Sequence, residues 1–163
     1  MKKLPILHII TPVYNEGDNF PRLYKQVCRY VKTPFRLVVV YDFDEDNTVP
    51  VVEKYQEKDK GLILHKNTIG RGALNALKSG FDYVKDGPVL IIMADLSDDL
   101  AIVDKMYSEY LEGAAVVCGL RVFRWARGCR LRACLRACAP RFCRFRSFQL
   151  RAPLAGVCFV VLS

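Results

Sequence analysis

Apolar and polar residues alternate along the first two thirds of the chain in blocks that predict strands and helices by turns. Three short apolar runs rich in Val and Ile, at Leu4–Ile10, Leu37–Val40 and Val89–Met93, each end abruptly in polar or acidic residues. Short runs of this kind, separated by helical stretches, are typical of strands in a parallel sheet that is buried on both faces. Ligands bind beyond the carboxyl ends of such strands, where all three polar clusters fall. The pattern therefore predicts a binding site made of these clusters.

Segments with apolar residues at helical spacing lie between the strands. We expect helices at about 19–31, 49–57, 73–83 and 100–111, and further strands at 62–65 and 114–118. This alternation predicts right-handed crossovers and a doubly wound α/β sheet with flanking helices. Asp46 and Thr48 are expected to cap the second helix, and Asp98 and Asp99 the fourth.

Charge divides the chain of 163 residues into two unlike parts. Residues 1–118 carry 15 Lys and Arg against 17 Asp and Glu, a formal charge of −2, although the whole chain carries +8. Residues 119–163 hold 10 arginines and no lysine or acid, together with five of the seven cysteines. Two such different statistics predict a domain at 1–119 and a separate, irregular Arg/Cys-rich tail at 120–163.

The tail is open to three interpretations. Its arginines and aromatic residues could bind RNA, whereas the spacing of Cys129, Cys134, Cys138 and Cys143 is a poor match to a zinc site. We favour a third interpretation, in which the segment is translated from a shifted reading frame, because Lys, Asp and Glu vanish where Arg and Cys rise. Coding DNA around codon 120 in which neither other frame continues the domain would refute this hypothesis.

The acidic clusters suggest individual roles. Asp95 follows the third strand, where a fixed carboxylate can hold a divalent cation on a diphosphate, with Asp98 as a second candidate ligand. Asp42 is the better placed acid of the second cluster for a base or ribose contact. Pro12, Tyr14 and Glu16 combine a rigid ring, an aromatic surface and a hydrogen-bonding group, which suits a nucleobase, although an ordinary loop would look the same.

Other candidate motifs are weaker evidence for a functional site. Gly70-Arg71-Gly72 begins a G-x-G-x-x-G-like stretch, but it follows the wrong strand and lacks the acid about 20 residues on, so we reject a dinucleotide site. Arg71 could still lie near a phosphate. His8 is expected to be a core residue, and His65 receives no role.

Taken together, these motifs resemble family 2 glycosyltransferases, in the branch of the dolichyl- or polyprenyl-phosphate mannose synthases. The resemblance covers about residues 5–119, through Ile10–Glu16, the Asp42–Thr48 loop, Asn67 with Gly70–Ala73, and Met93–Asp95. Asp95 matches the second acid of the family's D-x-D motif, and Met93 stands where the first acid is usual. Tyr41 likewise replaces the first acid of the D-D-G-S loop.

The resemblance implies a GT-A type fold and inverting transfer of mannose or glucose from a GDP- or UDP-sugar. By this resemblance, the nucleotide sugar would be bound by Pro12, Tyr14, Glu16, Asp42, Arg71 and Asp95. The Mg2+ or Mn2+ ion would be bound by Asp95 and Asp98. The usual acceptor is a lipid phosphate such as polyprenyl or dolichyl phosphate at a membrane surface. No catalytic residue is assigned. The acceptor half of the family lies beyond residue 121, so we expect nucleotide binding without turnover.

Two alternatives remain at this stage: an RNA-binding protein that uses the arginine-rich tail, and a nucleotidyltransferase with a similar sheet. The sequence shows neither the pattern of a signal peptide nor a run of roughly 18 apolar residues. We therefore expect a cytoplasmic location, with peripheral association at the cytoplasmic face of a membrane.

Overall fold

The computed structural model describes residues 4–114, 116–119, 142–145 and 157–162. Within these ranges, seven strands form one sheet in the order β3-β2-β1-β4-β7-β5-β6. The strands are β1 (Leu7–Pro12), β2 (Phe35–Tyr41), β3 (Leu62–Lys66), β4 (Gly87–Ile91), β5 (Val116–Gly119), β6 (Phe142–Phe145) and β7 (Val157–Leu162). All neighbours pair in parallel except β5 and β6, which are antiparallel.

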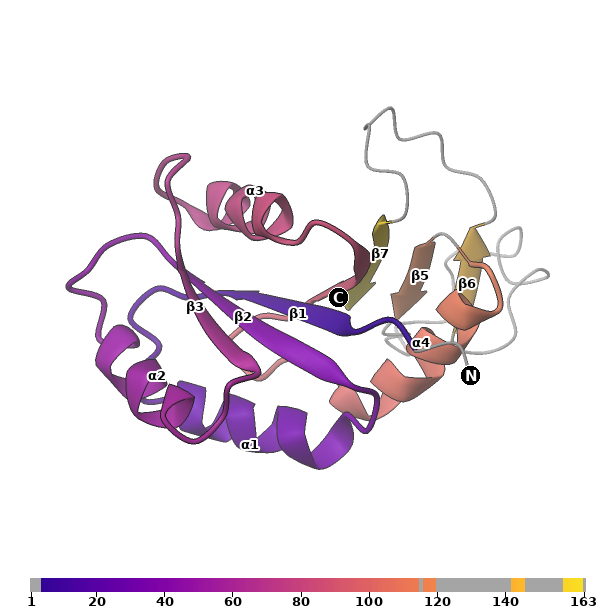
Figure 1. The fold of residues 1–163 in the computed structure, drawn as a ribbon, viewed down its shortest axis with the longest axis horizontal. Coiled ribbons are helices and arrows are strands. Elements are labelled where there is room, and N and C mark those ends of the chain that lie inside the picture. The colour runs from indigo at the N-terminus through magenta and orange to yellow at the C-terminus, as the bar shows by residue number, and fades with distance from the viewer. Residues whose placement is uncertain (1–3, 115, 120–141, 146–156, 163) are drawn as a thin grey trace, which may run out of the picture.

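Helices cover both faces of this sheet, so the predicted doubly wound α/β architecture is confirmed (Figure 1). The helices are α1 (Phe20–Tyr30), α2 (Val49–Gln56), α3 (Ala73–Tyr83) and α4 (Val103–Leu111), the last preceded by the 3-10 turn η1 (Leu100–Ile102). Helices α1, α2 and α4 lie against one face, and α3 lies alone against the other.

The unbroken apolar run in β2 follows from this two-sided cover. Successive side chains of a strand point to opposite faces, so Leu37 and Val39 enter the core beneath α1 and α2, and Val38 and Val40 enter the core beneath α3. All four are buried. Neither face is left for water, and a polar residue anywhere in the run would be buried without a partner.

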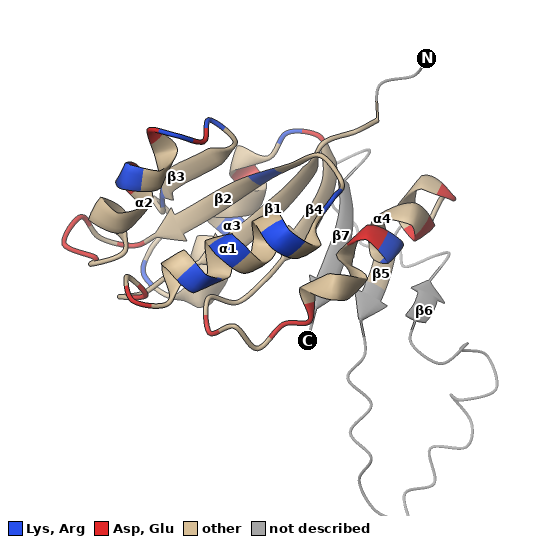
Figure 2. Ribbon diagram, turned by 90° about the horizontal axis from the view of Figure 1, so that it is seen from below, with Lys and Arg blue, Asp and Glu red and all other residues tan. Residues whose placement is uncertain are grey.

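Helix α1 is amphipathic because one of its faces packs on the sheet and the other faces outward. Phe20, Leu23 and Val27 recur at helical spacing and are buried on the sheet. Pro21 lies in the first turn, where a backbone N–H would have no acceptor within the helix, so its absence in proline costs no hydrogen bond. The outer face carries basic residues, whereas the loops at the carboxyl ends of the strands are largely acidic (Figure 2).

Several element boundaries differ from the sequence expectation. Strand β1 begins three residues later than expected and includes Pro12, because its pairing with β2 continues from Leu7↔Phe35 through Pro12↔Val40. Strand β4 ends at Ile91, so Asp95 lies four residues beyond it rather than next to its end. The fourth helix begins as the 3-10 turn η1 before it becomes α-helical.

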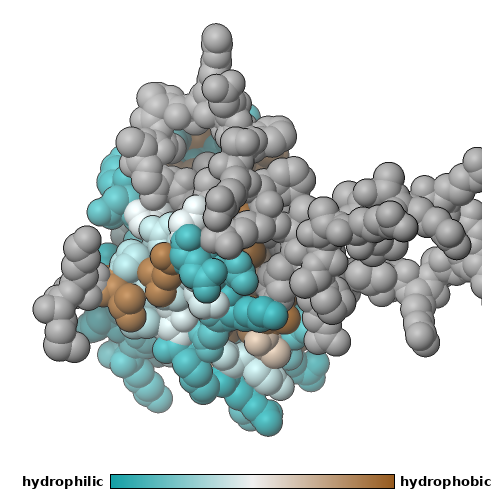
Figure 3. Space-filling model, turned by 90° about the vertical axis from the view of Figure 1, so that its right-hand side faces the viewer, coloured by the Kyte–Doolittle hydropathy of each residue, from teal (hydrophilic) through white to brown (hydrophobic). Residues whose placement is uncertain are grey.

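The tail prediction falls mostly on residues outside the described ranges. Its described parts are β6 and β7, and β7 pairs in parallel with both β4 and β5. The described surface at the α4 end of the molecule is mainly hydrophilic, with apolar side chains in small patches (Figure 3). None of the helices formed by the described residues has the length and apolar character needed to cross a membrane.

Helix α3 packs very closely on the sheet at Gly80. A Cβ added there would lie 2.7 Å from Ile10 Cγ2 and 3.2 Å from Val40 Cγ2. Both neighbours are fully buried and cannot move aside easily. The substitution Gly80→Val should therefore lower the free energy of unfolding by about 2 kcal/mol through overpacking, as measured by urea denaturation. Lys78→Val, on the exposed side of the same helix, should stay within about 0.5 kcal/mol. Equal losses in the two variants would contradict this account of α3 packing.

Candidate functional site

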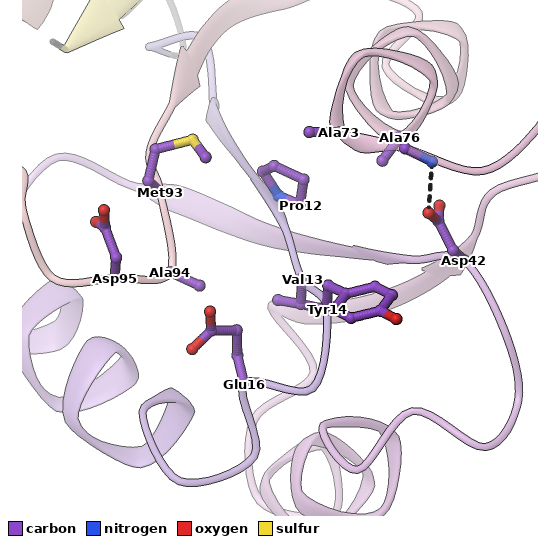
Figure 4. Close-up of a pocket in the computed structure, with 11 residues that line it drawn as sticks. Pro12, Val13, Tyr14, Glu16, Asp42, Ala73, Ala76, Met93, Ala94 and Asp95 are labelled. Atoms are coloured by element: carbon purple, nitrogen blue, oxygen red, sulfur yellow. Dashed lines mark hydrogen bonds between the residues drawn. The ribbon is translucent and has the colours of Figure 1, made fainter.

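A pocket of about 350 Å³ lies beyond the carboxyl ends of β1, β2 and β4. It is lined by Pro12, Val13, Tyr14, Glu16, Asp42, Gly72, Ala73, Ala76, Met93, Ala94 and Asp95. Parallel pairing of β1 with β2 on one side and β4 on the other brings the three polar clusters to one edge. Five of the six residues predicted for the nucleotide sugar therefore line one pocket (Figure 4).

Asp42 forms one end of the pocket and is held by two donors. Its Oδ1 accepts a hydrogen bond from Asn67 Nδ2 at 2.8 Å, and its Oδ2 accepts one from the Gly72 backbone N–H at 2.7 Å. Asn67 also donates to the Gly70 carbonyl and accepts from the Ile69 N–H. Asp42 thus joins the end of β2 to the glycine loop that begins α3. A negative charge at this place is favourable, because it faces the positive end of the helix dipole.

Asp95 and Glu16 lie together at the opposite end of the pocket from Asp42 (Figure 4). Asp95 follows β4 in a tight turn in which its Oδ1 accepts from the Ser97 N–H at 2.9 Å. Leu96, between them, has a φ of +62°, a left-handed conformation that is costly for a branched apolar residue. Packing of Leu96 against the core holds this turn in place.

The second predicted metal acid, Asp98, lies outside the pocket lining. Its Oδ2 accepts from the Met93 backbone N–H at 2.8 Å, so it closes the loop on which Asp95 sits. Asp99 accepts from the Ala101 N–H and caps η1, as predicted for a helix-capping acid. Asp99, and not Asp98, occupies the N-cap position of η1.

Tyr14 and Arg71 both contact Phe43, and of these three residues only Tyr14 lines the pocket. Tyr14 is 67% exposed, and its ring meets the edge of Phe43 with 5.4 Å between ring centres. The Arg71 guanidinium lies 5.7 Å from the centre of the same Phe43 ring. Arg71 is the one predicted nucleotide-sugar residue that does not line the pocket. Its charge is held over the Phe43 ring by a cation–π contact.

The pocket lining has an unusual balance of charge. It contains three carboxylates, from Glu16, Asp42 and Asp95, and no lysine, arginine or histidine among the described residues. Such a pocket repels a bare phosphate, and it suits a ligand that offers hydroxyl or N–H donors or that arrives with a cation. Its volume lies within the usual range for small-molecule sites, about 300–1,000 Å³.

Sequence reasoning missed two kinds of site residue. Gly72, Ala73 and Ala76 line the pocket through their small size, which lets the first turn of α3 approach the ligand space. Small side chains carry no functional group that would mark them as binding residues. Their position on one face of the predicted helix is the only sequence feature that could have indicated a place in the pocket lining. The second kind is Thr48: it occupies the N-cap position of α2, but its hydroxyl makes no capping bond. The predicted side-chain cap is therefore wrong, and Thr48 Oγ1 accepts from the Glu16 N–H instead.

Neither histidine lines this pocket. His8 is half-buried in β1, and burial, with a further contribution from the Arg36 charge, lowers its pKa. His65 lines a second cavity of about 380 Å³ between β3 and α3, where its Nε2 lies 3.0 Å from Ser79 Oγ. Burial lowers the pKa of His65 as well, so both rings are neutral at pH 7.

The sequence matches a family model described as glycosyl transferase family 2 over residues 8–150. An uncharacterized glycosyltransferase of Synechocystis is 29% identical over 119 residues, which are 71% of this chain and 37% of that protein. The undecaprenyl-phosphate 4-deoxy-4-formamido-L-arabinose transferase of Pseudomonas fluorescens is 28% identical over 126 residues, covering 72% of this chain and 36% of that protein. The chain thus spans little more than a third of the length of these relatives.

A solved structure shares the fold. The mannosyltransferase PcManGT of Pyrobaculum calidifontis, in complex with GDP-Man and Mn2+, superimposes with a TM-score of 0.58 at 21% identity. The match covers 74% of this chain and 36% of that one. This likeness confirms the expected GT-A type of fold. None of the three proteins is named as RNA-binding or as a nucleotidyltransferase.

The bond between Asp42 and Gly72 can be tested without any ligand. Asp42→Ala removes the acceptor of the Gly72 N–H, so hydrogen exchange of that amide, followed by NMR, should accelerate by about tenfold. Asp44→Ala is the matched control, because the Asp44 carboxylate pairs with Lys66 at the surface rather than with the glycine loop. Equal exchange at Gly72 in both variants would refute the proposed link.

Proposed function

The chain belongs to glycosyl transferase family 2, and on that premise we propose that its pocket binds the nucleoside diphosphate part of a GDP- or UDP-hexose. The observation that carries the proposal is the separation of acids in the pocket: Asp42 lies at one end, and Glu16 and Asp95 lie at the other. An elongated ligand with hydrogen-bond donors at one end and a diphosphate at the other matches this arrangement.

The base and ribose are assigned to the end formed by β1 and β2. Pro12 and the exposed ring of Tyr14 offer apolar surface to a base, and Asp42 offers acceptors to ribose hydroxyls or base N–H groups. Glu16, at the Asp95 end of the pocket, offers an acceptor to the part of the nucleotide that lies nearer the diphosphate. Arg71, whose guanidinium lies over Phe43 and which precedes the Gly72 bound to Asp42, would add positive charge at the Asp42 end of the nucleotide. Each of these roles is part of the proposal.

The diphosphate is assigned to the Asp95 end, together with Mg2+ or Mn2+. Among the described residues, no group of three His, Cys, Asp or Glu side chains could hold a metal unaided. Mg2+ in nucleotide sites is commonly bound by one or two carboxylates plus substrate phosphates and water, and Asp95 supplies such a carboxylate. The residues therefore fit a cation that enters with the nucleotide. Its chemistry would be to neutralise charge on the leaving diphosphate.

The reaction we propose for the complete family protein is transfer of mannose or glucose to a polyprenyl or dolichyl phosphate. A phosphate oxygen would attack the anomeric carbon as the bond to the nucleoside diphosphate breaks, and the acceptor, already anionic, needs little help from a base. Support for the acceptor comes from the name of the Pseudomonas relative, which acts on undecaprenyl phosphate. Such an acceptor would bring the protein to the cytoplasmic face of a membrane.

The proposal divides the chain as the charge pattern suggests. Residues 1–119 are assigned to the nucleotide-sugar-binding domain and residues 120–163 to an atypical segment, possessing no assigned role in binding. The proposal assigns the donor nucleotide to described residues and assigns none of them to the acceptor, so its tests use nucleotide binding.

Asp95→Ala tests the metal assignment. Calorimetric titration with GDP and UDP should show Mn2+-dependent binding to the wild-type chain, weaker by about tenfold or more in EDTA. In Asp95→Ala the affinity in Mn2+ should fall to the value in EDTA, because the carboxylate that anchors the cation is lost.

Asp99→Ala is the control for this experiment, since Asp99 caps η1 and does not line the pocket. It should bind as tightly as the wild type. Met93→Asp, which adds a second carboxylate from a 40% exposed position in the lining, should strengthen Mn2+-dependent binding. Equal affinity of Asp95→Ala and the wild type in Mn2+ would remove Asp95 from the metal site.

A further inference from the structure

We infer that the side chains of Asp46, Asn47 and Thr48 are positioning residues of the nucleotide pocket, because they fix the shape of the loop at residues 14–17. This inference rests on the proposed function, since positioning matters for binding only if the pocket takes a nucleotide. None of the three side chains lines the pocket. They act through Tyr14 and Glu16, which do.

Three consecutive backbone N–H groups of the loop donate to these three side chains. The Asn15 N–H donates to Asp46 Oδ2 at 3.0 Å, and the Glu16 N–H donates to Thr48 Oγ1 at 2.8 Å. The Gly17 N–H donates to Asn47 Oδ1 at 2.9 Å. Successive N–H groups that converge in this way form a concave site for an anion. Here that place is taken by oxygens from the loop after β2.

Burial makes these bonds consequential. Asp46 is 1% exposed and Thr48 is fully buried, so water cannot replace an acceptor that is removed. The bonds that they accept from Asn15 and Glu16 are part-buried, and a donor that loses its partner away from water costs more than the bond itself contributes. Asp46 is also used twice, because its Oδ1 accepts from the Thr48 N–H at 2.8 Å. The three residues therefore form one hydrogen-bonded unit.

The backbone of the donating loop, at residues 14–17, has a conformation that allows these three bonds. Asn15 has a φ of +55°, in the left-handed region that Asn tolerates better than most residues. A Cβ added at Gly17 would lie 2.7 Å from the Asn47 carbonyl oxygen, so the two loops approach each other as closely as their backbones permit. The Asn47 N–H donates in turn to Asn15 Oδ1 at 3.4 Å.

This unit fixes two walls of the pocket relative to each other. Tyr14 immediately precedes the three donors, and Glu16 is one of them, with its Oε2 accepting from Asn19 Nδ2 at 2.7 Å. Asp42 lies on the same loop as the three acceptors. Loss of one acceptor would leave the lining residues unchanged in identity but less ordered, and ordering them on binding would lower affinity.

The test compares Thr48→Val with Thr48→Ser in the full chain. Valine has nearly the shape of threonine but no acceptor, whereas serine keeps the hydroxyl. Thr48→Val should raise the rate of hydrogen exchange at the Glu16 amide by about tenfold. It should also raise the Kd for GDP or UDP with Mn2+ by about tenfold. Thr48→Ser should stay within about twofold of the wild type in both.

A second pair of variants, Asn47→Ala and Glu45→Ala, keeps the test decisive if Thr48→Val fails to fold. Asn47 is exposed, so Asn47→Ala should fold, accelerate exchange at Gly17 and weaken the same Kd. Glu45→Ala is its control: Glu45 is exposed, and the loop N–H groups bond to Asp46, Asn47 and Thr48 instead, so this variant should change neither. Unfolding midpoints are measured alongside, because a purely structural role would lower the midpoint without weakening the Kd of the folded protein.

The outcomes separate this inference from the proposed function. Unchanged Kd values in both Thr48→Val and Asn47→Ala, with faster exchange at Glu16 and Gly17, would overturn the positioning role and leave the function standing. Absence of nucleotide binding by the wild-type chain would overturn the proposed function and the positioning role with it. The exchange measurements would then still show whether the three side chains order the loop.

Discussion

The site depends on one feature of the sheet: β1 is paired in parallel on both sides, with β2 through six residue pairs and with β4 through three. Parallel pairing in register places the ends of three strands side by side, so loops that are far apart in the sequence meet at one edge. The apolar runs of these strands are long enough to be covered on both faces. A change that shifts β1 by one residue would turn its side chains to the wrong core and separate Tyr14 from Asp42.

Around this frame, several polar side chains accept hydrogen bonds from backbone N–H groups of the loops. Asp42 accepts from Gly72, Asp98 from Met93, and Thr48 from Glu16. The bonds of Asp42 and Thr48 join two loops, and the bond of Asp98 closes one, so together they stabilise an acidic rim whose charges repel one another. The pocket is therefore shaped before a ligand arrives, and its three carboxylates favour a ligand accompanied by a cation.

Much of this could be predicted from the sequence. The apolar runs predicted the three strands, and the acids at their ends predicted the place of the site, because in parallel sheets topology alone brings strand ends together. Local chemistry was less predictable. Asp98 and Thr48 both matched helix-capping patterns, yet their oxygens accept from backbone groups of Met93 and Glu16. Such partners depend on loop conformations, as at Leu96 with its positive φ, and no sequence period specifies them.

The central claim is that GDP or UDP binds at this edge of the sheet with a cation at Asp95. Amide NMR spectra recorded on titration with each nucleotide in Mg2+, and then in paramagnetic Mn2+, test it most directly. The account predicts shifts in the loops at 13–17, 42–48, 70–76 and 93–98, with Mn2+ broadening strongest around Asp95. Shifts confined to the second cavity around His65 and Tyr83, or broadening centred away from Asp95, would contradict it.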